Sequence, residues 1–343
     1  MAEDNNESIG MPTKTTVSPE NENSTVASYA ALYATLNLSP LSGNNENGPV
    51  ENKTTRATTT TTTDASRPMY WQEDDWTDVD FASAEGLLDE SRSRCAIPSS
   101  KRKEQYEKDA GKNWDRFYQS HQTNFFNDRH YLQKDFPNEF GQDEQTRDDK
   151  KCLMEIGCGV GNNILPLLDR YRSWEMWGYD ISSVAVQLMQ NEPRFVAAKD
   201  RVHAGVWDIA STAPPTPVVG VADITTLVFC LSAIAPDKMQ QAAIHVATTL
   251  KQGGTLVFRD YGRYDAAQMK LGTSRSKQIS DNFYVKSDGT RCYYFTTDDL
   301  HRLFVENAGM KVLELRYLRR VYQNRAQNQQ RRRVWVQARF EKV

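Results

Sequence analysis

Residues 151–162, KCLMEIGCGVGN, decide the fold, because a short apolar run passes directly into three glycines at alternate positions. The run predicts a buried strand, and the glycine loop allows the backbone to press against a ligand at the start of the following helix. A dinucleotide-binding loop would place its third glycine at position 162, where Asn162 stands. The loop therefore favours a nucleoside ligand over a pyrophosphate.

Downstream of this loop, apolar runs with strand character alternate with helical patterns. We expect strands at 151–157, 175–180, 201–209, 222–234 and 255–262, with helices at 162–172, 182–191 and 237–254 between them. After a helix at 296–309, two more strands are expected at 311–318 and 332–340, lying antiparallel at the sheet edge. This alternation predicts an α/β fold: a Rossmann-like, seven-stranded mixed sheet with helices on both faces.

Acidic residues end two of the expected strands. Asp180 lies about twenty residues beyond the glycine loop, where a carboxylate can accept both ribose hydroxyls, and Asp208 can receive an adenine amino group. An adenosine without a pyrophosphate cradle indicates S-adenosylmethionine as the cofactor.

Charge is distributed unevenly along the chain. Residues 1–100 hold 6 basic and 16 acidic side chains, whereas residues 311–343 hold 10 basic and 2 acidic ones. The Thr-, Asn- and Ser-rich stretch 1–66 predicts a disordered tail. No apolar stretch is long enough to span a membrane, and the five cysteines show no metal-ligand spacing, so we expect an intracellular protein without a metal site.

The basic C-terminal block, interleaved with Tyr and Trp, is typical of a polyanion-binding surface, although a solvated strand pair also tolerates many arginines. We expect RNA contacts there, near the turn after 255–262, and in the stretch 125–129; the candidate residues are Arg129, Arg263, Tyr264, Arg319, Arg320, Arg332 and Arg333.

Several blocks of the chain resemble one family in content and order. They are NWDRFYQSHQTNFFNDRHYLQKDFP (113–137), EIGCGVGN (155–162), LSAIAPDKM (231–239), FRDYGRYD (258–265), ISDNFYVKSDGTRCYYFT (279–296) and RVWVQARF (333–340). Together they resemble the tRNA N3-methylcytidine methyltransferases, which have the class I S-adenosylmethionine-dependent fold. Upstream, YWQEDDW (70–76) and KRKEQYEKDAGKNWDRFY (101–118) are similar to the cytoplasmic branch that acts on threonine tRNA.

The resemblance implies a cofactor site composed of Trp114, Tyr118, Gly157, Gly159, Asp180, Asp208 and Val228. It also implies three parts: the tail 1–66, an extension 67–148 that covers the cofactor and contacts RNA, and a methyltransferase domain 149–343. Ser183, Trp207 and Ala235 depart from the family pattern, and Ala235 stands where relatives carry His, which bears on the contact to the base.

The stretch FRDYGRYD supplies the candidate chemistry. Asp260 can take the exocyclic amino group of a cytosine and stabilise the positive charge that develops on its ring. Tyr261 or Tyr264 can stack on the flipped base, and Arg259 or Arg263 can hold a carbonyl or a flanking phosphate. The alternative is a local ion pair between Asp260 and Arg263 that closes the turn.

The resemblance implies that the protein transfers a methyl group to N3 of cytidine 32 in the anticodon loop of a tRNA, in the cytoplasm or nucleus. An adaptor protein or an aminoacyl-tRNA synthetase is a conceivable partner, and neither DNA nor a membrane is expected. Two alternatives stay open: methylation of a protein or small metabolite, and a catalytically silent RNA-binding relative.

Overall fold

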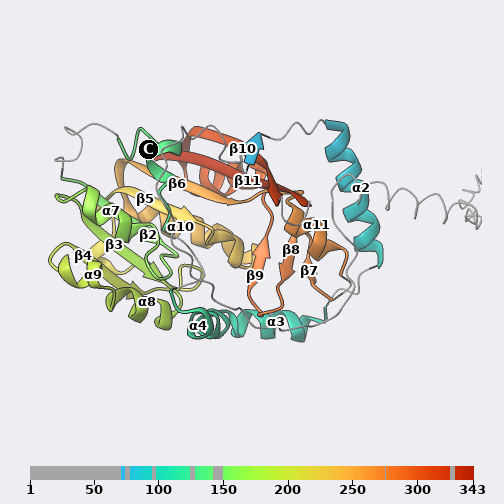
Figure 1. Ribbon diagram of the computed structural model, residues 1–343, viewed down its shortest axis with the longest axis horizontal. Helices are drawn as coiled ribbons and strands as arrows, with labels where there is room; N and C mark the ends of the chain where they lie inside the picture. The colour runs from blue at the N-terminus through green and yellow to red at the C-terminus, as the bar shows by residue number, and fades with distance from the viewer. Residues whose placement is uncertain are drawn as a thin grey trace, which may run out of the picture.

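The computed structural model describes residues 71–73, 78–94, 98–123, 128–141, 150–274, 276–324 and 329–343 (Figure 1). The predicted disordered tail at 1–66 lies outside these residues. None of the helices in the described ranges is long and apolar enough to cross a membrane.

A mixed sheet forms the centre of the molecule, with strand order β1-β10-β11-β6-β5-β2-β3-β4. Its parallel strands are β2 (Cys152–Ile156), β3 (Glu175–Asp180), β4 (Val202–Val206), β5 (Ala222–Val228) and β6 (Leu250–Tyr261). In β2 and β5 nearly every residue is buried, because helices cover both faces of the sheet. The five predicted parallel strands are confirmed.

Helices on the first face are α7 (Ile164–Arg170), α8 (Ser183–Gln190) and α9 (Pro193–Ala197), with the short α5 (Leu132–Asp135) beside them. Leu165, Leu168 and Met189 from this layer pack on Val257 of the sheet. The second face carries α10 (Met239–Thr249), α12 (Thr297–Leu300) and the π-helix η4 (His301–Asn307). These two apolar layers fix the strand ends that form the site.

The C-terminal strands complete the sheet as an antiparallel ribbon. β11 (Gln329–Lys342) lies between β6 and β10 (Met310–Asn324) and is antiparallel to both. The predicted seven strands are present, and β1 (Trp71–Glu73) pairs with β10 as an eighth strand. A strand of three residues shows too little alternation to be predicted from sequence.

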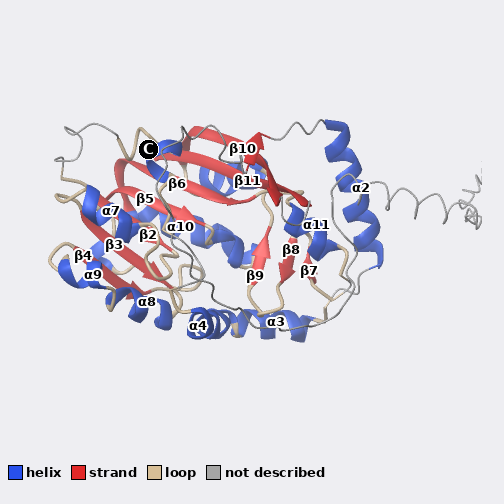
Figure 2. Ribbon diagram, viewed as in Figure 1, coloured by secondary structure: helices blue, strands red, loops and turns tan. Residues whose placement is uncertain are grey.

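A small antiparallel sheet follows β6 and α11 (Ala266–Gly272), with strands β7 (Gln278–Ser280), β8 (Phe283–Val285) and β9 (Arg291–Tyr293). Figure 2 shows these strands set apart from the main sheet. Helices α3 (Ser100–Lys108) and α4 (Ala110–His121) run end to end along one edge, from α8 to this small sheet, and α2 (Asp78–Arg94) lies beside α11 (Figure 1).

Candidate active site

A cavity of about 410 Å³ opens where the parallel strands end. This volume lies within the range of about 300–1,000 Å³ that is usual for small-molecule sites. The wall combines the ends of β2, β3 and β5, the segment after β4, and helices α3 and α4. Its lining residues include Trp114, Tyr118, Gly157, Asp180, Asp208, Phe229 and Cys230.

The glycine loop after β2 needs its glycines for both conformation and space. Gly157 and Gly159 have φ angles of +73° and +54°, in the left-handed region that glycine favours. A Cβ on Gly157 would lie 2.5 Å from Cys230, and one on Gly159 would lie 2.5 Å from the Tyr118 hydroxyl. The loop therefore approaches its neighbours as closely as backbone atoms allow.

Asp180 is the buried carboxylate at the end of β3. Its Oδ2 accepts a hydrogen bond of 2.8 Å from the Gly159 N–H, and its Oδ1 accepts one of 2.8 Å from the Ser182 N–H. Burial raises the pKa of Asp180, although these backbone donors oppose the shift. Each oxygen keeps a further acceptor site for a ligand hydroxyl, which matches the predicted ribose contact.

Asp208 lines the cavity, two residues beyond β4, which ends at Val206 and is shorter than the predicted strand 201–209. Its Oδ1 accepts a hydrogen bond of 3.0 Å from the Ala210 N–H, which holds the carboxylate beside Trp207 and Ile209 of the wall. The two predicted strand-end acids are therefore brought to the same cavity.

Helix α4 brings Trp114 and Tyr118 to the cavity wall. Their ring centroids are 6.0 Å apart, and the helix is held against α8 by Asp115, whose Oδ1 accepts hydrogen bonds from the Ser182 hydroxyl at 2.7 Å and the Val184 N–H at 3.2 Å. The predicted aromatic cover of the cofactor thus lies next to Asp180. Asp115 did not stand out in the sequence, because its partner is 67 residues away.

At the end of β5 the structure differs from the prediction. The Val228 side chain is buried, with 2% exposure, and the cavity is lined instead by Phe229 and Cys230. Phe229 has a φ angle of +55°, a strained conformation for a residue with a Cβ. The turn after the strand directs the next two residues, rather than Val228, toward the cavity.

Arg129 lies beside the glycine loop. Its guanidinium is over the Phe229 ring at 5.3 Å, Nη1 lies 3.4 Å from the Val228 carbonyl, and the Arg129 N–H donates to the Asn162 carbonyl at 2.8 Å. The sequence predicted an RNA contact for this arginine. The structure places it between the cofactor loop and Phe229.

Asp260 is fully buried at the end of β6, beneath the turn η2 (Leu231–Ala233). Its Oδ2 accepts a hydrogen bond of 2.9 Å from the Ser232 N–H, and its Oδ1 accepts one of 2.8 Å from the Tyr261 N–H. Burial raises the Asp260 pKa to about 6, which the backbone donors and Lys286 counteract only in part. The carboxylate holds the η2 turn in place and is not among the residues that line the cavity.

Tyr261 belongs to an aromatic cluster at the same end of β6. Its ring centroid is 5.0 Å from that of Phe229 and 5.8 Å from that of Tyr294, and Lys286 Nζ lies 5.8 Å from the Tyr261 centroid. Phe229 belongs to this cluster and also lines the cofactor cavity, so the cluster adjoins the cavity.

Arg259 points to the other face of the sheet. It donates to Asp135 at 2.7 Å and to Gln337, and its guanidinium lies 4.5 Å from the Tyr131 ring centroid. With a side-chain exposure of 7%, Arg259 ties α5 to the sheet. The predicted role in holding a substrate carbonyl is not supported by this position.

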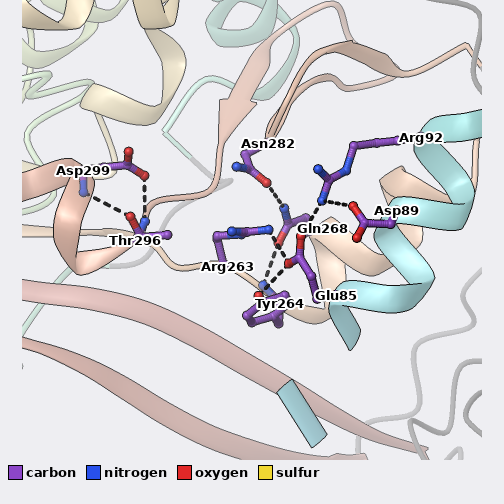
Figure 3. Close-up of polar contacts among 9 residues, drawn as sticks. All are labelled: Glu85, Asp89, Arg92, Arg263, Tyr264, Gln268, Asn282, Thr296 and Asp299. Atoms are coloured by element: carbon purple, nitrogen blue, oxygen red, sulfur yellow. Dashed lines mark hydrogen bonds and ion pairs between the residues drawn. The ribbon is translucent and has the colours of Figure 1, made fainter. Parts of the chain in front are cut away.

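Arg263 and Tyr264 bind helix α2, as Figure 3 shows. The Arg263 guanidinium donates to Glu85 Oε2, and the Tyr264 hydroxyl donates to the same oxygen at 2.6 Å. The local Asp260–Arg263 ion pair, considered as the alternative for this turn, is therefore wrong: the partner of Arg263 is Glu85, which is 178 residues earlier in the chain.

The arginines of the C-terminal ribbon lie at adjacent positions of the β10–β11 pair. Arg320 is opposite Arg333, and Arg332 is opposite Val321. Arg333 donates to Asp265 at 2.7 Å, and the Arg319 guanidinium lies 5.3 Å from the Tyr317 centroid. The ribbon thus gathers the predicted basic residues, with Arg333 fixed by an acid.

A charged cluster that sequence reasoning missed lies on the cavity wall. Glu107 of α3 pairs with Lys238 Nζ at 2.7 Å and with Arg291 of β9. Arg291 is only 6% exposed on its side chain, and its guanidinium stacks 5.4 Å from the Phe283 centroid. These three residues come from distant segments, so no local pattern could have revealed them. The described residues hold no group of His, Cys, Asp or Glu suited to a metal ion.

Comparison with known proteins accounts for this arrangement. A family profile described as a methyltransferase domain matches residues 121–315. The tRNA N(3)-cytidine methyltransferase METTL2 of Danio rerio is 33% identical, with 80% of this chain and 86% of that protein covered. The tRNA N(3)-methylcytidine methyltransferases Mettl2 of Drosophila melanogaster and trm140 of Schizosaccharomyces pombe are 34% and 32% identical, each over 79% of this chain and over 83% and 86% of their own lengths. The chain belongs to the tRNA N3-cytidine methyltransferase family.

Proposed function

We propose that the protein transfers a methyl group from S-adenosylmethionine to N3 of a cytidine in the anticodon loop of a tRNA. The observation that carries this proposal is the cavity at the strand ends, where Asp180, Asp208 and the aromatic pair of α4 surround the glycine loop. Family membership supplies the substrate class, since the relatives are named for this reaction on tRNA.

The residues present fit the cofactor. The free acceptor sites of Asp180 would take the ribose hydroxyls, and Asp208 would accept from the adenine amino group. Gly157 and Gly159 allow the methionine part to lie against the backbone, while Trp114 and Tyr118 exclude water from the other side. When bound, S-adenosylmethionine supplies an electrophilic methyl group on a sulfonium.

The substrate base would enter from the side of Phe229. Neutral cytosine carries a lone pair on N3, so the reaction requires no general base, only a dry site and in-line placement of N3. Phe229 and Tyr261 would pack on the base, and Arg129 would donate to its carbonyl. Asp260 would lower the energy of the positive charge that develops on the ring, through its carboxylate beneath η2.

The half-buried arginines of β10 and β11 support an RNA-binding role for the C-terminal ribbon, because phosphate contacts position a stem without reading its sequence. We further propose a threonine tRNA, cytidine 32 and action in the cytoplasm, with a nuclear pool as an alternative. The resemblance of 70–76 and 101–118 to the threonine-tRNA branch supports the first two. The free thiols of Cys152, Cys158, Cys230 and Cys292 agree with a reducing compartment. Involvement of an adaptor protein or a synthetase is part of the same proposal.

Incubation of the purified protein with S-adenosylmethionine and an unmodified threonine-tRNA transcript, followed by mass spectrometry of the nucleosides, tests this function. N3-methylcytidine in the wild-type reaction and at least a tenfold smaller yield with Asp208→Asn are expected. Cofactor binding without methylation of any tRNA, even after addition of cell extract, would contradict the tRNA activity. Failure to bind the cofactor would favour a catalytically silent RNA-binding protein.

A further inference from the structure

We propose that Arg263 and Tyr264 form a seat for a backbone phosphate of the RNA, and that Glu85 of α2 occupies this seat in the free protein. The inference rests on the proposed function and adds to it a self-inhibiting contact. In this arrangement the acidic helix α2 is displaced when the RNA binds.

The seat consists of donors that converge on one oxygen. The Arg263 guanidinium and the Tyr264 hydroxyl both donate to Glu85 Oε2, while Arg92 of α2 itself donates to Oε1 at 2.6 Å (Figure 3). A guanidinium and a hydroxyl directed at the same point are the donors that bind phosphate oxygens. A carboxylate that fills such a position presents the same kind of acceptor as a phosphate, with less charge.

The backbone that carries the two donors is held independently of α2. The Arg263 N–H donates to the Phe295 carbonyl at 3.0 Å, and the Tyr264 N–H donates to the buried Gln268 side chain at 2.6 Å. Tyr264 adopts a φ angle of +68°, and the Arg263 guanidinium lies 5.0 Å from its ring centroid. The backbone of the seat would therefore stay in place after Glu85 leaves.

The seat also lies beside the proposed base site. Arg263 follows Tyr261 by two residues, and the Gly262 N–H between them donates to the Val334 carbonyl of β11 at 2.9 Å. Val334 is next to Arg333 of the basic ribbon. An RNA strand that places its base at Tyr261 and its stem on the ribbon would run past Arg263 and Tyr264.

Helix α2 has the charge of a nucleic-acid competitor. Its sequence, DVDFASAEGLLDESRSR, holds five acidic and two basic residues, whereas residues 101–343 carry a net charge of +7. Its described apolar contact with α11 consists of Ala84 and Leu88 packed on Met269, with Leu87 and Tyr264 at the border. This small apolar contact and the one carboxylate shared by Arg263 and Tyr264 bind α2 weakly enough for a polyanion to displace the helix.

Binding of an unmodified tRNA transcript to the full chain tests the proposal, with affinity measured by fluorescence anisotropy at several salt concentrations. Glu85→Gln should bind about three- to tenfold more tightly, with a log–log salt slope steeper by about 1, because one more cation is free for phosphate. Asp89→Asn is the matched control: it lies on the same helix, removes the same charge and pairs with Arg92 at 3.0 Å. Its tRNA affinity should stay within about twofold of wild type.

Substitutions of the two donors, Arg263 and Tyr264, distinguish a phosphate-binding seat from a purely structural ion pair. Tyr264→Phe and Arg263→Gln should weaken tRNA binding, because they remove the seat, whereas Glu85→Gln strengthens it. A purely structural contact would give changes of the same sign from both sides. Weaker or unchanged binding by Glu85→Gln overturns the proposal.

If Glu85→Gln unfolds, Tyr264→Phe decides, since loss of one hydroxyl leaves the packing in place; unchanged or tighter tRNA binding by this variant then overturns the proposal. These experiments use binding without turnover. Failure to form N3-methylcytidine would therefore defeat the proposed function, while equal tRNA affinities of Glu85→Gln and wild type would defeat only the phosphate seat.

Discussion

The Tyr118 hydroxyl lies only 2.5 Å from the position of a Cβ on Gly159, so the aromatic cover of α4 and the glycine loop after β2 leave no room for a side chain there. This contact joins two segments that are 41 residues apart and closes the cavity beside Asp180, whose Oδ2 accepts from the Gly159 N–H. The close approach makes the loop sensitive to the smallest possible side chain.

Gly159→Ala should weaken S-adenosylhomocysteine binding by at least about 30-fold, because the methyl group meets Tyr118 and the residue has a positive φ. Isothermal titration calorimetry measures the change. Gly220→Ala is the control, since it has a φ of +68° but open space around its Cβ, and it should bind like wild type. The double variant Gly159→Ala/Tyr118→Phe should recover part of the affinity, and no recovery would show that backbone strain alone causes the loss.

Asp180→Asn should reduce cofactor affinity more than Asp208→Asn. The Asp180 carboxylate accepts two backbone N–H groups and would also accept from the ribose, and a charged hydrogen bond is worth about 1.5–3 kcal/mol, or roughly 10- to 150-fold in Kd. Asp208 accepts one backbone N–H from Ala210, so about tenfold is expected there. Equal losses in the two variants, measured by calorimetry, would contradict the assigned division of roles.

The methylation rate should fall as the pH drops below about 6. Burial raises the Asp260 pKa to about 6, and only the ionised carboxylate stabilises positive charge on the base. Single-turnover rates between pH 5 and 8 should show this acidic limb, and Asp260→Asn should be slower at pH 7.5 and lose the limb. A limb of the same position in the variant would assign it to another group.

The raised pKa of Asp260 also makes the stability of the fold depend on pH: stability falls as the pH rises, whereas the methylation rate falls as the pH drops. Since the folded-state pKa of Asp260 exceeds its unfolded value near 3.8, its contribution to the free energy of unfolding is lost as the pH rises through about 6. The stability difference between wild type and Asp260→Asn, from urea unfolding, should therefore shift against wild type between pH 4 and 7. An invariant difference would mean that the carboxylate is not desolvated as described.

Glu107→Gln should accelerate release of S-adenosylhomocysteine by about three- to tenfold, because Glu107 ties α3 to Lys238 and Arg291, which also line the cavity. Stopped-flow displacement gives the dissociation rate. Glu104→Gln changes an exposed residue of the same helix and should leave the rate unaltered. Equal rates in all three proteins would show that α3 does not control cofactor exchange.

Asp135→Asn should destabilise the fold by about 3–5 kcal/mol without changing cofactor affinity in the folded protein. It leaves the buried Arg259 guanidinium without its carboxylate partner, and such an unpaired charge is costly. Thermal unfolding measures the loss of stability, and calorimetry measures the cofactor affinity. A loss of cofactor affinity equal to that of Asp180→Asn would show that Arg259 contributes to the cofactor site after all.

The parallel strands and the two acids at their ends were predictable from sequence, because each lies inside one continuous pattern. Asp180 is the last residue of β3, and the direction of the strand alone carries it to the cavity. Phe229 was missed because its approach depends on a positive φ after β5, which no apolar pattern encodes in a residue with a Cβ. The sequence suggested that Arg259 contacts the substrate. Because side chains alternate along a strand, Arg259 instead points away from Asp260, toward an acid in α5.

The partners of Arg263 and Glu107 were beyond sequence reasoning for a different reason. Glu85 and Arg263 are separated by 178 residues, and Glu107 and Arg291 by 184. From the sequence alone, any acidic residue of the extension 67–148 is an equally good partner for any basic residue of the methyltransferase domain. Only the packing of α2 and α3 on the small sheet and α11 selects among them.

The position of β11 determines what a shortened chain can become. Val336 and Gln337 of β11 pair with Asp260 and Arg259 of β6. One side of β6 is therefore covered by residues some 76 positions later in the chain. A premature stop codon before Gln329 would leave β6 with a long open edge of unpaired N–H and C=O groups. Such an edge recruits other strands, so truncation alleles would yield aggregates that cells clear, and not a smaller enzyme with partial activity.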